Sequence, residues 1–411
     1  MTRLILILLL GLQMACHSEE AGLTERPGNQ AVTDWRLLIQ LPDVELPARL
    51  HLSADGSEAW VLNGLEKVNI DDVSKDGENW RLHFPAFNNT LVLREKNGFM
   101  EGELTLVKRG YKQLMPVRAE PDSGFRFLSD PKPESDFTGR WQVTFVEDDG
   151  KETTAIGEFD QQGSKVRGTF LTPLGDYRFL AGEVDGDMMY LSTFDGAHAF
   201  VFQAQMLTDG SLKGDFWSGT RWHESWTAQR NFEAKLPDAY SLTFLKDGYD
   251  RIEFNFPDLD GNPVALTDEK YRDRVVLVTL SGSWCPNCAD EIDFLSAYYN
   301  QHHERGLEIV TLLYERYDEF DLAARQGRAL QSKHGVNFDI LIAGNSDKTM
   351  ASETLPMLNH VLAFPTMIFI DRKGVVRMIH TGFSGPGTGQ HYTDFVEEFN
   401  VLMDDLLDED L

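Results

Sequence analysis

The feature that most constrains the fold is a short apolar segment that leads directly into a pair of cysteines. Residues 275–281 are an apolar, β-branched run of the kind that forms a buried strand. Cys285 and Cys288 follow it, and a second buried strand is predicted at residues 307–315. Between them, apolar residues recur at helical spacing: Ile292, Leu295, Tyr298 and Tyr299. This order predicts a βαβ unit with the cysteines at the C-terminal end of its first strand, where open α/β sheets place reactive groups.

The two cysteines are spaced so that both can lie in the first turn of a helix and form a disulfide. We expect Cys285 to be exposed and Cys288 to lie beneath it. Free N–H groups and the helix dipole stabilise a thiolate at a helix N-terminus, so Cys285 is the expected attacking sulfur and Cys288 the resolving one. The same spacing makes half of a zinc site. No second such pair follows, and His302 and His303 are adjacent to each other, so we expect no metal.

A proline stands at the head of a later apolar segment, residues 363–371. Pro365 is therefore a candidate for a cis peptide bond, which would lock a turn and expose neighbouring backbone to a partner chain. Hydrophobic patterning predicts one more buried strand at residues 338–343. It also predicts helices at residues 319–334 and 392–407.

Residues 256–407, a little over a third of the chain, resemble a thioredoxin-fold domain of the TlpA/ResA type. Proteins of this type are membrane-tethered thiol-disulfide oxidoreductases of the bacterial cell envelope. The resemblance is carried by these segments: residues 258–266, residues 284–288, Glu291, residues 364–366 and the hairpin at residues 371–376. They are specific for the fold but do not identify a substrate.

The resemblance implies a role for each site residue. Cys285 would be the nucleophile, Cys288 the resolving thiol, and Glu291 the acid that tunes thiol protonation. The residues expected to contact the client are Trp284, Pro286, Phe364 and Pro365. No cofactor is implied beyond the redox-active disulfide. The implied partners are a protein thiol or disulfide client and a membrane-linked electron donor protein.

The acidic residues near the cysteines bear on the direction of the reaction. A carboxylate close to a thiolate disfavours the thiolate and so opposes the helix dipole. Together with the resemblance, Glu291 therefore favours a weak oxidant that acts as a reductase. We interpret Asp290 and Asp293 simply as acidic residues favoured near a helix N-terminus.

The N-terminal residues indicate export and lipidation. An apolar stretch at residues 4–12 is too short to span a bilayer as a helix, and residues 12–16 resemble a lipoprotein processing site that ends at Cys16. Gln13 departs from that pattern, because an aliphatic residue is usual there. We expect a lipoprotein signal peptide at residues 1–16 and a tether at residues 17–33. Lipid on Cys16 would hold the chain on the inner or outer membrane of the bacterial cell envelope, facing the periplasm. The alternative is ordinary signal cleavage, which leaves Cys16 as a spare thiol or removes it.

Before the cysteine motif, short alternating runs separated by Gly, Asp and Asn indicate an antiparallel sandwich or barrel. A faint internal repeat suggests two β domains or half-barrels, at residues 34–120 and 136–230, or one composite sheet. The predicted fold class is multidomain: an antiparallel all-β N-terminal region, possibly duplicated, followed by an α/β thioredoxin-fold domain at residues 250–408. Arg178, Asp195 and His198 lie at predicted strand ends of the second β segment. They would form either a ligand or client surface or ordinary turns and packing, and we favour the latter.

Composition and motif context narrow the remaining classes of function. The formal net charge of −28 argues against binding nucleic acid through a basic surface. A thiol peroxidase shares the fold but usually places one peroxidatic cysteine in a Thr-x-x-Cys setting, whereas residues 281–284 here read Ser-Gly-Ser-Trp and a second cysteine follows. A non-enzymatic alternative is a surface lipoprotein whose β domains bind a ligand or client, with an auxiliary thioredoxin domain.

Overall fold

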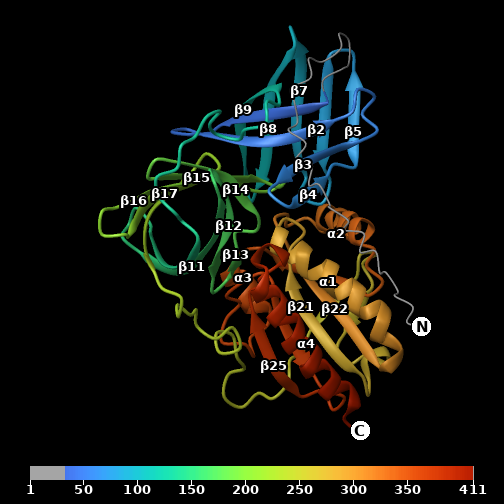
Figure 1. Ribbon diagram of the computed structural model, residues 1–411. Helices are drawn as coiled ribbons and strands as arrows, with labels where there is room; N and C mark the ends of the chain where they lie inside the picture. The colour runs from blue at the N-terminus through green and yellow to red at the C-terminus, as the bar shows by residue number, and fades with distance from the viewer. Residues whose placement is uncertain (1–32, 411) are drawn as a thin grey trace, which may run out of the picture. The chain divides into compact units, whose positions relative to one another are not determined.

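The computed structural model describes residues 33–410. Cys16, the expected signal peptide and nearly all of the expected tether lie outside the described residues. The predicted fold class is confirmed, because two antiparallel β sheets precede an α/β domain with a thioredoxin fold (Figure 1). Within the described part of the chain, no helix is both long and apolar enough to cross a membrane.

The first sheet has nine strands in the order β4-β3-β2-β1-β9-β8-β7-β6-β5. Its edge strands β4 and β5 are consecutive in the chain, and β4 ends at Asn69 while β5 begins at Asp72. Three Cα steps span at most about 11 Å, so the two edges approach each other and the sheet is rolled. Its strands are β1 (Asp34–Gln40), β2 (Glu45–Leu52), β3 (Ala59–Asn63), β4 (Glu66–Asn69), β5 (Asp72–Asp76), β6 (Asn79–Phe84), β7 (Asn89–Lys96), β8 (Phe99–Lys108) and β9 (Tyr111–Pro121).

The second sheet closes on itself. Its order is β11-β10-β18-β17-β16-β15-β14-β12-β13, and a further antiparallel pairing between β11 and β12 joins the two ends into a barrel. A closed sheet leaves no free edges for unwanted strand pairing. The strands are β10 (Gly139–Val146), β11 (Glu152–Gln162), β12 (Lys165–Thr172), β13 (Gly175–Asp176), β14 (Leu180–Asp185), β15 (Met188–Phe194), β16 (Ala199–Met206), β17 (Leu212–Ser218) and β18 (Trp222–Arg230).

Aromatic side chains fill the inside of this barrel. Figure 1 looks into the ring of strands β11 to β17, but the ring is not hollow. The ring centroids of Phe202 and Phe216 lie 4.3 Å apart, and those of Phe170 and Phe202 lie 4.6 Å apart. Trp226 is fully buried and packs edge-on against Phe170. Because the interior is packed like a protein core, this barrel meets other parts of the molecule through its loops and outer surface.

The C-terminal domain is built on a five-stranded sheet in the order β23-β22-β21-β24-β25. Strands β21, β22 and β23 run parallel to one another, β24 runs antiparallel to β21, and β25 runs antiparallel to β24. The elements are β21 (Val275–Ser281), α1 (Pro286–His302), β22 (Leu307–Glu315), α2 (Phe320–His334), β23 (Asp339–Asn345), α3 (Lys348–Thr354), β24 (Thr366–Ile370), β25 (Val376–Thr381) and α4 (Gln390–Asp408), with a preceding hairpin of β19 (Asn255–Pro257) and β20 (Pro263–Ala265). The predicted βαβ unit, the strand near residues 338–343 and the two further helices are confirmed.

Both faces of this sheet are covered, which explains why β21 is buried along its whole length. Val275 and Leu277 belong to the apolar core that contains α1 and α4. Val276, Val278 and Leu280 point to the opposite core, which contains α3 and the β19–β20 hairpin. A strand buried on both faces reads as a continuous apolar run, the pattern on which its prediction depended.

Candidate active site at the start of helix α1

Strand β21 delivers the cysteine pair to the N-terminus of α1. Cys285 is the N-cap, with extended backbone angles, and Pro286 occupies the first helical position, where a missing N–H costs nothing. The Cys288 backbone N–H donates to Cys285 Sγ at 3.2 Å. Cys285 and Cys288 form a disulfide with their Cα atoms 5.2 Å apart. The sulfur of Cys285 is thus held where unpaired helix N–H groups would stabilise a thiolate.

The expectation that Cys285 would be exposed is wrong. Cys285 is only 7% exposed, and Cys288 is completely buried. The reason is the segment before β24, which lies against the disulfide and brings the Phe364 carbonyl oxygen within 3.5 Å of Cys285 Sγ. The Cys285 sulfur is therefore largely covered by the chain's own backbone.

The predicted cis peptide is confirmed, since the bond between Phe364 and Pro365 is cis. Pro365 is buried, and its carbonyl accepts a hydrogen bond from the Gly382 N–H at 2.9 Å. Thr366 then begins β24, next to β21 in the sheet. This arrangement ties the proline segment to the sheet that carries the cysteines.

The aromatic residue before the disulfide packs between the C-terminal ends of the strands. The Trp284 indole N–H donates to the Tyr314 carbonyl at 2.9 Å, and its ring meets Phe364 edge to face at a centroid distance of 5.8 Å. The Arg316 guanidinium lies 5.0 Å from the Trp284 ring centroid. Trp284 and Phe364 thus lie beside Cys285, whereas Pro286 is buried and its carbonyl accepts a hydrogen bond from Arg178 of the β region. Client contact by these residues stays a prediction.

Glu291 lies in α1 with its side chain fully buried. One carboxyl oxygen is paired with the Thr279 hydroxyl, and within residues 33–410 the other oxygen, Oε1, has no hydrogen-bond partner. Burial raises the pKa of Glu291 to about 8, because a charged carboxylate is poorly solvated there. The group can therefore hold or release a proton near neutral pH, which is what a tuning acid requires.

A second buried acid, Glu315, was not predicted from the sequence. It ends β22 and accepts a hydrogen bond from the Ser283 backbone N–H at 2.9 Å, two residues before Cys285. Burial raises its pKa to about 7. The available signal was a charged residue at the end of an apolar strand whose C-terminus meets the cysteine motif. Glu291 and Glu315 give the site two proton-binding groups in an apolar setting.

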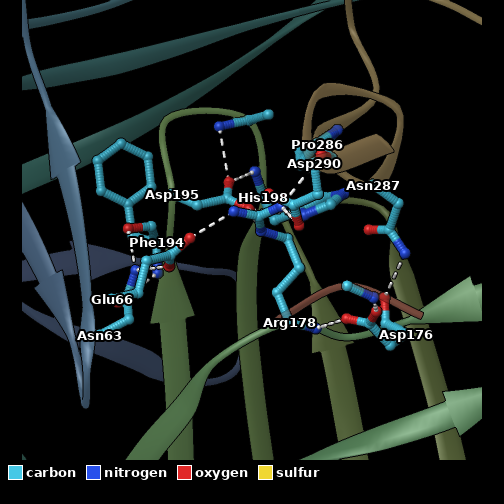
Figure 2. Close-up of polar contacts among 12 residues, drawn as sticks. Asn63, Glu66, Asp176, Arg178, Phe194, Asp195, His198, Pro286, Asn287 and Asp290 are labelled. Atoms are coloured by element: carbon cyan, nitrogen blue, oxygen red, sulfur yellow. Dashed lines mark hydrogen bonds and ion pairs between the residues drawn. The ribbon is translucent and has the colours of Figure 1, made fainter. Parts of the chain in front are cut away.

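Arg178 and Asp195 were favoured as turn and packing residues, and the structure corrects this in part. The Asp195 carboxylate does make turn contacts, accepting from the backbone N–H groups of Ala197 and His198. Arg178, however, is buried and forms ion pairs with Asp195 and with Asp290 of helix α1 (Figure 2). The interpretation of Asp290 as a merely favourable helix-terminal charge is therefore wrong, because its partner comes from the β region.

Part of this chain is similar in sequence to a known protein family and to known thiol-disulfide oxidoreductases. Residues 236–394 match the Redoxin family. The thiol-disulfide oxidoreductase ResA of Bacillus thuringiensis subsp. konkukian is 25% identical over 132 residues, which cover 32% of this chain and 68% of that protein. The thioredoxin-like protein YneN of Bacillus subtilis is 25% identical over 138 residues, covering 34% of this chain and 73% of that one.

Solved structures that resemble this chain match less than half of it. A secreted thiol-disulfide isomerase from Corynebacterium glutamicum is 16% identical with a TM-score of 0.31, and the match covers 44% of this chain and 99% of that one. A thioredoxin-family thiol:disulfide interchange protein from Chlorobium tepidum is 16% identical with a TM-score of 0.28, covering 36% of this chain and 98% of that one.

Proposed function

We propose that this chain, whose C-terminal domain is a Redoxin domain, reduces disulfides of client proteins in the cell envelope. The sequence relatives of that domain include thioredoxin-fold thiol-disulfide oxidoreductases. The observation that carries this proposal is the Cys285–Cys288 disulfide at the N-terminus of α1, beside a cis proline and above a buried acid. These groups suffice for dithiol exchange without a bound cofactor.

The first step forms a mixed disulfide. The Cys285 thiolate attacks one sulfur of a client disulfide, the client S–S bond breaks, and the departing client sulfur leaves as a thiolate that takes up a proton. A new S–S bond now joins Cys285 to the client. The client backbone would lie against Phe364 and Pro365, which flank the Cys285 sulfur.

The second step releases the client. The Cys288 thiol loses its proton and attacks Cys285 Sγ, so the bond to the client breaks and the second client thiol departs. Two electrons have passed from the Cys285–Cys288 dithiol to the client disulfide. The buried carboxylate of Glu291 would accept the Cys288 proton. Return to the dithiol form requires a thiol or dithiol donor, which we assign to a membrane-linked protein.

The surroundings of the sulfurs favour the reducing direction. Burial of Cys285 and Cys288 in an apolar setting disfavours their thiolates, and ionised Glu291 or Glu315 would disfavour them further. A disulfide reductant is a weak oxidant, because its dithiol form is not strongly stabilised. The helix N-terminus opposes this, because both cysteines lie within its first turn.

The equilibrium reduction potential of the Cys285–Cys288 pair tests this direction. We expect a potential nearer to that of thioredoxin, about −270 mV, than to that of DsbA, about −120 mV. We also expect Glu291→Gln to shift it, because that variant removes an ionisable group near the pair. A wild-type potential in the oxidising range would instead indicate disulfide formation, and a pair that forms no disulfide would contradict exchange chemistry altogether.

Lipidation at Cys16 would fix the place of action. Residues 4–16 supply an apolar stretch and a cysteine in a lipoprotein-like setting, and lipid there would hold the enzyme at the inner or outer membrane with its disulfide in the periplasm. In cells that make the full chain, Cys16→Ser is expected to move the protein from the membrane to the soluble fraction and to abolish incorporation of a labelled fatty acid. Retention of the label by the variant would contradict the assignment.

A further inference from the structure

One arginine joins the two β sheets to the helix that carries the disulfide. Arg178 lies between β13 and β14, and only a tenth of its side chain is exposed. Its guanidinium forms ion pairs with Glu66 of β4, with Asp195 in the turn after β15 and with Asp290 of α1 (Figure 2). The three carboxylates belong to the first sheet, the barrel and the thioredoxin-fold domain. Because the carboxylates that compensate this buried cation belong to three different parts of the chain, the charge of Arg178 is compensated only while those three parts remain docked.

Two contacts place this arginine on the reactive turn itself. Arg178 Nη1 donates to the Pro286 carbonyl at 3.0 Å, and Pro286 directly follows Cys285. The Asn287 amide donates to the Asp176 carbonyl at 3.1 Å. The barrel therefore binds both residues that separate Cys285 from Cys288.

The approach between the barrel loop and the thioredoxin-fold domain is too close to leave room for side chains. A Cβ atom on Gly175 would lie 2.6 Å from the Asn287 amide nitrogen, and one on Gly387 would lie 2.9 Å from the Arg178 carbonyl carbon. Arg178 itself has a φ of 58°, in the left-handed region that side-chain-bearing residues adopt at a cost. Glycines and a strained arginine at the same contact indicate a fixed interface with a defined geometry.

The charges at this contact act on Cys285 with opposite signs. The Arg178 cation beside the first turn of α1 favours a thiolate there, as a nearby positive charge does for any thiol. The Asp290 carboxylate opposes it. The other charged and titratable groups around Arg178 are Glu66, Asp195, the imidazole of His198, which contacts Asp195, and the buried Asp176. The Asp176 carboxylate accepts a hydrogen bond from the Arg178 backbone N–H, and burial raises its pKa to about 6.

We propose that Arg178 is a positioning residue for thiol-disulfide exchange: it fixes the β region on the turn between the two cysteines and sets the balance of charge beside Cys285. The β region would then be a working part of the redox site and not only a spacer. The inference rests on the exchange chemistry proposed above but not on its direction.

Three full-length variants test this assignment. Arg178→Gln leaves Asp290 without its cation, so we expect the pKa of Cys285 to rise. We also expect the equilibrium between the Cys285–Cys288 pair and glutathione to shift about tenfold toward the Cys285–Cys288 disulfide, which lowers the reduction potential by about 30 mV. Asp290→Asn leaves the cation without that carboxylate, so we expect a severalfold shift in the opposite direction. Arg178→Lys keeps the charge and is expected to lie within about threefold of the wild type. The readouts are the reduction potential and the pH dependence of Cys285 alkylation.

Opposite signs are the decisive result, because loosened docking alone would move both variants in the same direction. Arg126→Gln is the matched control: Arg126 is also buried but contacts Ser192, Asn63 and the Leu62 carbonyl, all in the β region. We expect it to leave the potential unchanged. Equal shifts in Arg178→Gln and Arg126→Gln, or no shift in Asp290→Asn, would overturn the proposal. If Arg178→Gln does not fold, Asp290→Asn and Arg178→Lys still decide. A wild-type potential in the oxidising range would refute the reductase proposal and leave this comparison intact.

Discussion

Replacing Cys285 with serine is expected to lower the rate of client disulfide reduction by at least about a thousandfold, because Cys288, the other cysteine among residues 33–410, is completely buried and out of reach of a client. A serine hydroxyl is slightly smaller than a thiol and has almost no nucleophilicity toward a disulfide sulfur. The measurement is reduction of a disulfide-bonded protein substrate by the pre-reduced enzyme. The fold should persist, since the substitution keeps an N-cap residue that helices favour.

Cys288→Ser separates the two steps of the reaction. Cys285 can still attack, but nothing releases the client, so we expect an enzyme-client adduct that is stable on a non-reducing gel and disappears on adding a thiol. Peroxide consumption offers the discriminating control. A peroxidase needs only its peroxidatic cysteine to react, so rapid peroxide consumption by Cys288→Ser would contradict the reductase assignment and support the peroxidase alternative. An adduct that forms equally with Cys285→Ser would show that Cys285 is not the nucleophile.

The second large effect is the pH dependence of stability caused by Glu291. In the folded chain its pKa is about 8, compared with the ordinary value of 4.5 that the unfolded chain would show. Between these values the folded state holds a proton that the unfolded state has released, so the free energy of unfolding falls as pH rises from about 4.5 to about 8. The full shift corresponds to about 3–5 kcal/mol.

Glu291→Gln removes this dependence. We expect the stability of the variant relative to wild type to improve steadily from pH 4.5 to pH 8 and to level off above it, as measured by urea unfolding at each pH. The difference between the two proteins is the relevant quantity, because Glu315 adds a slope of the same sign to both. A difference that does not change with pH would show that Glu291 is not a buried, protonated acid. Glu304→Gln is a suitable control, since Glu304 is exposed after α1.

Much of the thioredoxin-fold domain could be predicted because its signals are local. The apolar run of β21, the spacing of the cysteines and the proline before β24 each specify structure within a few residues. Alternation and turn residues likewise predicted an antiparallel β region, although they did not distinguish a sandwich from a barrel. The roles of Trp284, Pro286, Phe364 and Glu291 stay predictions, since geometry shows where they lie and not how they act.

What could not be predicted depends on contacts between distant segments. Arg178 and Asp290 are 112 positions apart, and no local pattern distinguishes this pair from ordinary surface charges. The low exposure of Cys285 has the same origin, because the covering carbonyl comes from residue 364, 79 positions later. Burial of Glu315 follows from where β22 ends relative to the loop before α1, which only the assembled sheet reveals.

The docking of the barrel on the first turn of α1 limits what a shortened protein can report. A fragment that begins after β18 would carry Asp290 without Arg178 and would present the Asn287 amide to water instead of to Asp176. Its disulfide would be chemically intact but in a different electrostatic setting. Under the role proposed for Arg178, the redox properties of this chain depend on the β region as well as on the thioredoxin-fold domain, and a change in the β region would retune the disulfide without altering the domain that performs the chemistry.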